Sequence, residues 1–477
     1  MFRPDSQLAP FSPGKVAVAV LAALSLAGCA IGPDYVRPEA HLNLPAQYTA
    51  APIATSPAIA SSWWTLFGDA KLDELVAQAL AGSPDARIAS ARIEEADALL
   101  RQVDAALLPQ VNADAAGSRS RISQTNATPI PSTAPITRSS TRLSLSTTFE
   151  LDVWGKLRRA SEAAKAQALG TRYASETVSL SLSAAVVQAY LNLRAIDAEL
   201  RVTSDTVSSQ ARSAQLTRTR FEGGIASQLD VQQAEGALAT YTAALLELEK
   251  SRALSENLIG LLVGQPGLQI PAGDLRNLPL PPAPPAGLPS TLLEARPDVR
   301  QAETDLIAAN AKIGVAKAAL FPSITLTGNF GRESKDLSQL FSAPSAIWSL
   351  GAGITQPIFE GGRLRAQVDQ VTAQQKQSLE SYRKAAYTAF REVNDALVKV
   401  RQSGETEDAY TNAMKAAKRA LQLAQVRYDG GYSPYLDVLT AQRTANDATL
   451  AWVQNRQARL SATVELFKAL GGGWKNS

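Results

Sequence analysis

An internal duplication constrains the fold of this 477-residue chain more than any other feature. The motif at positions 84–87 (Pro-Asp-Ala-Arg) recurs 213 positions later at 297–300 (Pro-Asp-Val-Arg). Further along, the offset between matching motifs falls to 207 and then stays constant. Because a register that changes only once does not arise by chance, we predict two homologous halves, with six extra residues between Pro109 and Gly155. The other matching segments are 105–109 with 318–322, 155–158 with 362–365, 220–224 with 427–431, and 229–231 with 436–438.

Each half is predicted to open with a helix. In the first half, Ser83 supplies a capping hydroxyl, Pro84 suits the first turn, and Asp85 lies near the positive end of the helix dipole. Proline cannot continue a helix, so the first helix is expected to end near Pro109 and its counterpart near Pro322.

Two strands are expected after the first helix of each half. Residues 143–151 and 323–330 alternate apolar with polar side chains, which is typical of a strand with one apolar and one wet face. Their length is close to the 9–11 residues with which a tilted strand crosses a bilayer, although a strand of a soluble sandwich has a similar pattern. The polar stretch 118–141 is expected to form the hairpin tip and to hold the six extra residues. Trp154 and Trp348 lie near strand ends, either at a membrane interface or as packing residues.

A very long helix is expected next in each half. Residues 156–221 and 363–428 contain no proline and one glycine each, Gly170 and Gly404. At 1.5 Å per residue such a helix measures roughly 100 Å, which is too long for an ordinary globular domain. In the second half the apolar residues recur about every 3.5 positions, which is typical of a coiled-coil seam. They are Leu379, Tyr382, Ala386, Phe390, Val393, Leu397 and Val400.

Each long helix is predicted to end in a glycine turn and to be followed by an antiparallel return helix. Ser227 and Asp230 have the spacing of a capping box at the start of the first return helix. Ser433 is expected to cap the second, with Pro434 in its first turn. Each half therefore ends in a helical hairpin whose tip lies far from the strands. The turn residues are Gly223, Gly224, Gly430 and Gly431, and the return helices should reach Val263 and Leu470.

The N-terminus is predicted to be a bacterial lipoprotein signal. Basic residues precede the apolar run 16–24, which is too short to span a membrane stably. Residues 26–29 (Leu-Ala-Gly-Cys) resemble the lipobox, and the only cysteine of the chain, Cys29, falls at the lipidation position. By the same resemblance, Ala30 favours sorting to the outer membrane. We expect Cys29 to carry palmitate or a similar chain, whose buried CH₂ groups give affinity for outer-membrane lipid.

The predicted organisation follows from these signals and from a proline-rich stretch between the halves. Prolines at this density favour an extended linker. The segments are a lipoprotein signal peptide at 1–28, a lipid-anchored extended segment at 29–70, a first repeat at 71–264, the linker at 265–289, a second repeat at 290–472 and a C-terminal tail at 473–477.

Composition argues against several classes of function. A single histidine, His41, and a single cysteine form no metal-binding or acid–base cluster, so we expect no enzyme, no metal and no cofactor. The net charge of +3 gives no reason to expect a nucleic acid partner. No stretch of about 20 apolar residues follows the first 30 positions, so no internal membrane-spanning helix is expected.

The strand number predicts an oligomer. Two repeats supply four strands, and a four-stranded sheet in lipid has edges whose backbone groups lack partners, at several kcal/mol each. Closed membrane sheets usually need at least eight strands, so more than one chain is required.

Several motifs resemble the TolC-type outer-membrane efflux proteins, and the lipobox favours the NodT/OprM-like lipoprotein branch. This resemblance covers nearly the whole chain. It implies a mainly α fold with a membrane β-barrel, in which a homotrimer forms twelve strands and a long helical tunnel crosses the periplasm. It also implies a periplasmic adaptor protein, which would meet the hairpin tips, and an inner-membrane pump, usually of the resistance-nodulation-division type. The motifs are 295–303, 313–322, 31–38, 149–155 and 470–474.

A periplasmic gate is implied just after the second tip. Relatives often have an aspartate in this stretch where the chain has Thr440, and three ringed carboxylates would repel one another and attract cations. Thr440 removes that charge, which leaves Leu436 as an apolar plug. Asp437 is either a substitute charge or an ordinary acid at a helix start, like Asp230. Arg443 either pairs with a neighbouring helix or is a solvated charge.

Three functions follow as expectations. The first is a passive conduit for drugs or other small molecules within a tripartite efflux system, which would contribute to multidrug resistance. The second is the exit duct of a type I-like protein secretion system. The third, from another class, is a lipid-anchored coiled-coil adhesin or scaffold without a pore.

Overall fold

The computed structural model describes residues 30–38, 48, 61–123, 125, 135–282 and 296–472. The predicted signal peptide, Cys29 and the tail at 473–477 lie outside the described residues. Contacts divide the chain into two compact units, and each unit combines segments of both halves of the sequence. The sheet unit comprises Met1–Arg37, Glu94–Gly170 and Glu303–Ser381, and the body unit comprises Pro38–Ile93, Thr171–Ala302 and Tyr382–Ser477. The duplication therefore does not correspond to two separate compact bodies.

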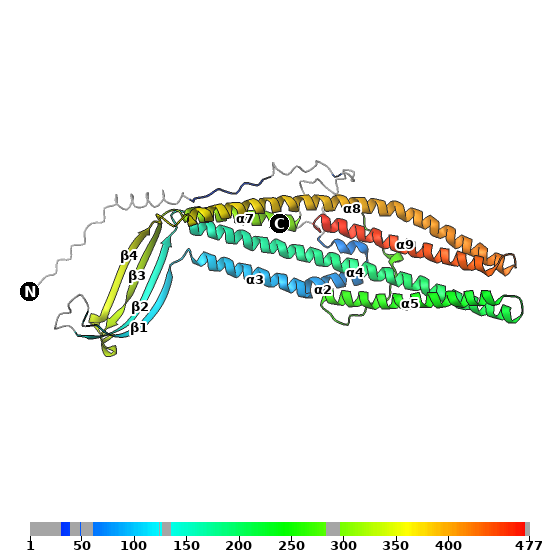
Figure 1. The fold of residues 1–477 in the computed structure, drawn as a ribbon, viewed down its shortest axis with the longest axis horizontal. Coiled ribbons are helices and arrows are strands. Elements are labelled where there is room, and N and C mark those ends of the chain that lie inside the picture. The colour runs from blue at the N-terminus through cyan, green and yellow to red at the C-terminus, as the bar shows by residue number, and fades with distance from the viewer. Residues whose placement is uncertain are drawn as a thin grey trace, which may run out of the picture. The chain divides into compact units, whose positions relative to one another are not determined.

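The sheet unit contains four antiparallel strands in the order β1-β2-β3-β4 (Figure 1). Leu145 of β2 lies opposite Phe330 of β3, which in turn lies opposite Trp348 of β4. Because successive side chains point to opposite faces of a strand, one face of the sheet is apolar and the other carries Ser, Thr and Asn. This confirms the predicted alternation. The strands are β1 (Gln110–Arg121), β2 (Thr137–Leu151), β3 (Ser323–Ser334) and β4 (Ala346–Thr355).

The first strand connection is shorter than predicted. β1 reaches Arg121 and β2 begins at Thr137, so both ends of the expected loop 118–141 are strand. The prediction was wrong there because serine, threonine and arginine at strand ends have the composition of a loop, whereas the ladder pairs Ser118 with Ser140. β2 has 15 residues and β4 has 10, so the extra length of the first half lies partly in the strand.

The two tryptophans near strand ends have different surroundings. The indole N–H of Trp154 donates to the carbonyl oxygen of Pro322 at 2.8 Å, and its ring lies 5.0 Å from that of Phe321. Trp348 is 74% exposed on the apolar face of the sheet. Trp154 is therefore a packing residue at the base of the sheet, while Trp348 belongs to the exposed apolar face.

The long helices agree with the sequence signals. In Figure 1, α5 runs back beside α4, and α9 runs back beside α8. The predicted seam in α8 faces inward, and Tyr382, Ala386 and Val393 are fully buried. Among the described residues, no helix is both long and apolar enough to cross a membrane. The helices of the two halves are α3 (Pro84–Ala105), α4 (Lys156–Glu222) and α5 (Gln228–Val263), then α7 (Pro297–Ala318), α8 (Arg363–Asp429) and α9 (Tyr435–Ala469).

Two elements near the start of the body unit were not predicted. The 3₁₀ helix η2 (Trp63–Phe67) and the helix α2 (Ala70–Gly82) pack into the main hydrophobic core. Trp63 is 1% exposed, and its ring stacks on that of Phe467 at 5.3 Å. The last part of the segment predicted to be extended up to residue 70 is therefore helical at Trp63–Phe67, where its aromatic side chains have core partners.

A buried charge network fixes the start of the linker to the body unit. The Asp197 side chain is 2% exposed and accepts hydrogen bonds from Arg194 at 3.0 Å, Arg252 at 2.7 Å and the backbone N–H of Gly273 at 2.8 Å. Arg194 also donates to the carbonyl oxygen of Pro271 at 2.7 Å. Because a buried carboxylate needs such partners, this part of the linker is held to α4 and α5.

Candidate functional site

The hairpin tips of the body unit contain the residues predicted to meet an adaptor and to close a channel. The first tip joins α4 to α5, and the second joins α8 to α9. Gly224 and Gly431 have φ values of 76° and 77°, in the left-handed region that favours glycine. All four turn glycines are exposed, so both turns are accessible on this chain; they are Gly223, Gly224, Gly430 and Gly431.

The first tip has the predicted capping box. The backbone N–H of Asp230 donates to Ser227 Oγ at 3.1 Å, and the backbone N–H of Ser227 donates to Asp230 Oδ2 at 3.0 Å. The Ser227 hydroxyl also donates to Asp230 Oδ2, at 2.8 Å. Two backbone donors at the start of α5 are thereby satisfied by residues of the turn itself.

The second tip lacks this box, and the predicted cap by Ser433 is wrong. Pro434 occupies the capping position and provides no side-chain hydrogen bond there. Within the described residues, Ser433 Oγ is buried without a hydrogen-bond partner. The helix begins one residue later than the Ser-Pro signal indicated, because Pro434 takes an extended ψ of 160°. Asp437 donates its backbone N–H to the Pro434 carbonyl at 3.2 Å, and its side chain is exposed.

A long-range contact joins the two tips. The guanidinium carbon of Arg220, at the end of α4, lies 4.7 Å from the ring centroid of Tyr428, at the end of α8. Arg220 also lies 4.0 Å from the carboxylate of Asp429. Such a cation–π contact contributes about 0.5–2 kcal/mol, depending on how far it is removed from water. The contacts at the second tip therefore include a residue from the first half of the chain, Arg220.

Tyr435 extends this contact into a small apolar cluster. Its ring lies 5.5 Å from that of Tyr428, and its hydroxyl donates to Gln210 Oε1 at 3.4 Å. Burial raises the pKa of the Tyr435 hydroxyl above its usual value, since the charged phenolate is disfavoured away from water. The cluster consists of Ala214, Ala234, Tyr435 and Val438, with Leu238, Leu421, Ala424, Tyr428 and Leu439 packed against it.

Three of the four candidate gate residues share one exposed face of α9. Leu436, Thr440 and Arg443 are spaced by four and three residues, which places them along one side of a helix. Leu436 is 52% exposed. Thr440 Oγ1 donates to the carbonyl oxygen of Leu436 at 2.8 Å, so this hydroxyl is hydrogen-bonded within its own helix. Asp437 lies about a quarter-turn away from this face, at 100° per residue.

Asp447 adds a charge to the same face that was not predicted. It follows Arg443 by one helical turn, and the two side chains approach to 3.8 Å while remaining 63% and 80% exposed. In this chain Arg443 is therefore a solvated charge with a weak partner in its own helix. The i, i+4 spacing could have identified Asp447, but Arg220 and Tyr428 are 208 positions apart and give no local signal.

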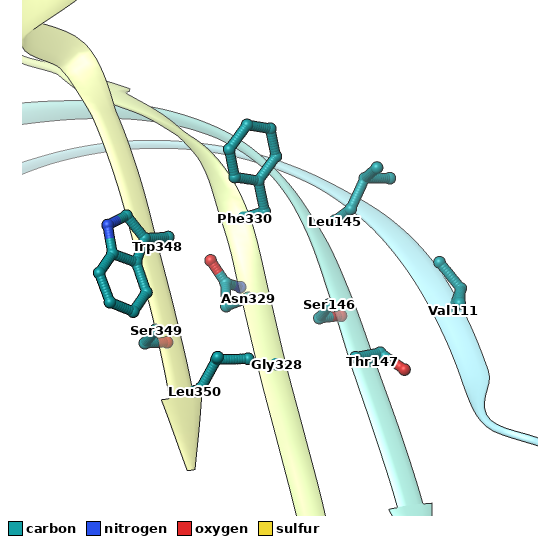
Figure 2. A pocket seen from close by; sticks show the side chains of 10 residues that line it. All are labelled: Val111, Leu145, Ser146, Thr147, Gly328, Asn329, Phe330, Trp348, Ser349 and Leu350. Atoms are coloured by element: carbon teal, nitrogen blue, oxygen red, sulfur yellow. The ribbon is translucent and has the colours of Figure 1, made fainter. Parts of the chain in front are cut away.

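The apolar face of the sheet unit is the second notable surface. Figure 2 shows Val111, Leu145, Phe330 and Trp348 contributed by the four strands. Gly328 lies beside them and leaves a shallow cavity of about 440 Å³. Phe330 and Trp348 are 68% and 74% exposed, so this surface requires an apolar environment or a partner. Within the described ranges, no group of His, Cys, Asp and Glu side chains is placed to hold a metal ion.

Comparisons of sequence agree with these features. The model of the family described as outer membrane efflux protein matches residues 75–265 and 288–472. The toluene efflux pump outer membrane protein TtgF of Pseudomonas putida is 36% identical over 471 residues, which cover 96% of this chain and 97% of that protein. The cation efflux system protein CusC of Escherichia coli is 33% identical over 462 residues, with 95% and 97% covered.

A solved structure shows that the likeness extends to the fold. The MtrE outer membrane channel of Neisseria gonorrhoeae, described in its open state, superposes with a TM-score of 0.84 at 29% identity. The match covers 93% of this chain and 98% of the channel chain.

Proposed function

The chain belongs to the outer membrane efflux protein family, and on that premise we propose that three copies assemble into a channel that exports small molecules. The family consists of channel-forming proteins rather than enzymes, and the chain is the outer membrane channel component of an efflux system. The observation that carries the proposed assembly is the open sheet. Within the described residues, β1 and β4 each pair on one side only. Unpaired edge groups in lipid cost several kcal/mol each, and neighbouring copies would supply the missing partners.

A lipid anchor at Cys29 is the second part of the proposal. The lipobox resemblance and the position of the only cysteine support it. Acyl chains on Cys29 would hold the chain to the outer membrane by burying their CH₂ groups. The repeats at 71–264 and 290–472 would then extend from the membrane into the periplasm.

The proposed partners are a periplasmic adaptor protein and an inner-membrane pump of the resistance-nodulation-division type. The exposed turns at 223–224 and 430–431 suit contact with an adaptor, because they are accessible ends of long helices. The names of the relatives refer to toluene and to cations, which supports small molecules as the exported class. These names favour efflux over protein secretion and over a scaffold without a pore.

The proposed gate is the exposed face of α9 at the second tip. In a trimer, three copies of Leu436 could meet around the axis and form an apolar plug, which excludes ions by dewetting. Thr440 and Arg443 would line the same passage, and Asp437 would border it from about a quarter-turn away. The absence, among the described residues, of a side-chain cap at Pro434 supports this tip, rather than the first, as the movable one.

Conductance across planar bilayers tests the channel and the gate together. The purified full-length protein is expected to conduct weakly, and Leu436→Ala is expected to raise the conductance several-fold. Leu229→Ala, at the equivalent position of the first tip, is the matched control and should leave conductance unchanged. A complete lack of conductance in Leu436→Ala, with trimers verified by cross-linking, would contradict the proposal. Drug susceptibility of a deletion strain, beside an assay of toxin secretion, separates efflux from protein secretion.

A further inference from the structure

The short segment Ala30–Pro38, called the strap below, lies directly after the predicted lipidation site. It contacts the start of α4 in the sheet unit. The backbone N–H of Ile31 donates to the carbonyl oxygen of Trp154 at 3.0 Å. Arg159 of α4 donates to the carboxylate of Asp34 at 2.6 Å, and the Arg159 side chain is only 8% exposed. Glu162 of the same helix pairs with the other terminal nitrogen of Arg159 at 2.7 Å, so the nearly buried guanidinium joins Asp34 of the strap to α4.

The strap also contacts α7, which belongs to the other half of the sequence. The side-chain amide of Asn310 donates to the carbonyl oxygen of Pro33 at 2.8 Å. Arg37 and the Tyr35 hydroxyl both donate to the carboxylate of Glu303, at 2.8 and 3.2 Å. The strap therefore bridges α4 of the first repeat and α7 of the second.

Glycines allow the strap to approach the sheet unit backbone to backbone. A Cβ atom at Gly32 would lie 2.6 Å from the Cα atom of Gly314, and Gly32 has a φ of 119°. A Cβ at Gly314 would lie 2.8 Å from the Ile31 carbonyl oxygen. At the first residue of the strap, a Cβ at Gly155 would lie 3.0 Å from the Cα of Ala30. No side chain fits at these positions without movement, so this surface is shaped for the strap.

We propose that the surface formed by α4 and α7 is a docking site for the strap, which clamps the two repeats together and fixes the lipid anchor at the base of the sheet. Ala30 packs against Gly155, four residues after β2 ends at Leu151. Cys29 is one residue further, and consecutive Cα atoms are about 3.8 Å apart. The acyl chains and the strand ends are thereby held at the same level of the membrane. The anchoring part of this inference rests on the proposed lipidation of Cys29, whereas the clamp does not.

A nitroxide spin label at Val36→Cys tests the docking in the full-length protein. Val36 is 82% exposed, so a label there does not disturb the contacts described above. In the parent protein the label is expected to have the restricted motion of an exposed side chain on an ordered backbone, and it is called immobile in that sense. Gly32→Ala and Gly314→Ala should make it several-fold more mobile, because each adds a Cβ where the two backbones meet. A mobile label in the parent, or an immobile one in both variants, would overturn the proposal.

Two controls separate the clamp from general effects of the substitutions. Gly236 lies within helix α5 with open space around its Cβ position, so Gly236→Ala is a matched glycine replacement and should leave the label immobile. Gly314→Ala also approaches Arg159, at 2.9 Å from its Cγ, whereas Gly32→Ala changes only the strap. Release by both variants therefore assigns the effect to docking.

Labelling at Cys29 distinguishes failure of the clamp from failure of the anchor. If Cys29 carries lipid, only the cysteine introduced by Val36→Cys takes up a label. Two labels per chain would refute lipidation of Cys29 but would not contradict docking of the strap. In a Cys29→Ser background the label is expected to stay immobile, because the docking contacts are made by protein atoms alone. A mobile label in that background would show that the lipid holds the strap, and would refute the docking site.

Discussion

The two hairpin tips derive from one duplicated sequence, yet different side-chain contacts stabilise the helix starts that follow the turns. At the first tip, Ser227 and Asp230 exchange hydrogen bonds and order the start of α5 within the turn. At the second tip, Pro434 takes the place of Ser227, and Asp437 has an exposed side chain. Beside the backbone hydrogen bonds that both turns share, the second tip has a contact with Arg220, which comes from the first hairpin.

This difference indicates which tip can move. A local capping box holds a helix start whatever the neighbouring hairpin does, since both partners belong to the same turn. A contact between two hairpins is lost when the hairpins separate, and the second tip has no cap to replace it. We therefore expect the start of α9 to respond more to separation of the hairpins than the start of α5, and α9 also carries the candidate gate residues Leu436 and Thr440.

Of the substitutions considered, Tyr428→Ala should change the stability of a hairpin tip most. The variant loses the stacking of Arg220 and the contact with Tyr435, and it should weaken local closure of the second tip by about 2 kcal/mol. Hydrogen–deuterium exchange over the first turn of α9 measures this change directly. Phe221→Ala, at the equivalent place in the first half, is the control and should alter exchange little, because Phe221 is already 42% exposed. Equal effects of the two variants would refute the asymmetry.

Ser227→Ala should loosen the first tip alone. Loss of an N-cap hydroxyl usually costs about 1 kcal/mol, so exchange at residues 228–231 should accelerate roughly fivefold. The second tip should be unaffected, because its closure does not involve Ser227. Faster exchange at the start of α9 in this variant would show that the two tips are more strongly coupled than the contacts indicate.

Pro434→Ser should give the second tip the cap that the first already has. The new serine would stand three residues before Asp437, which reproduces the spacing of Ser227 and Asp230. A rebuilt box should stabilise the start of α9 by about 0.5–1 kcal/mol, although loss of the proline offsets part of the gain. The informative quantity is the difference in exchange between Pro434→Ser and Pro434→Ser/Asp437→Ala. No difference would mean that the box does not form.

Local sequence signals were sufficient for the elements but not for these differences. The alternation at 143–151, the uninterrupted helical stretches and the Ser227–Asp230 spacing each depend on residues close together in the chain, and the structure confirms them. Ser433-Pro434 was misread because both a cap followed by proline and a proline at the cap fit the same pair of residues. Choosing between them depends on the tertiary packing that buries the Ser433 hydroxyl.

Contacts between residues far apart in the chain could not be predicted from the sequence pattern. β1 alternates only small apolar residues with polar ones, at 110–115, and residues 117–121 are polar or glycine; it is a strand over Gln110–Arg121 because it pairs with β2 along its whole length. The strap follows the lipobox motif, but its fit against Gly314 depends on two glycines 282 positions apart. Arg220 and Tyr428 likewise meet only after both hairpins have formed. Periodicity cannot report contacts of this kind, since neither partner determines the local conformation of the other.

Arg443→Ala should have the smallest effect on the stability of the second tip. Arg443 and Asp447 are mostly exposed and 3.8 Å apart, and such a pair contributes about 0.3 kcal/mol. Exchange over α9 should therefore remain nearly unchanged, whereas a loss of protection comparable with that of Tyr428→Ala would contradict the structure. Conductance of the same variant gives an independent measurement. A several-fold rise in conductance without a change in exchange would assign Arg443 to a contact between copies. Unchanged conductance would leave Arg443 a solvated charge.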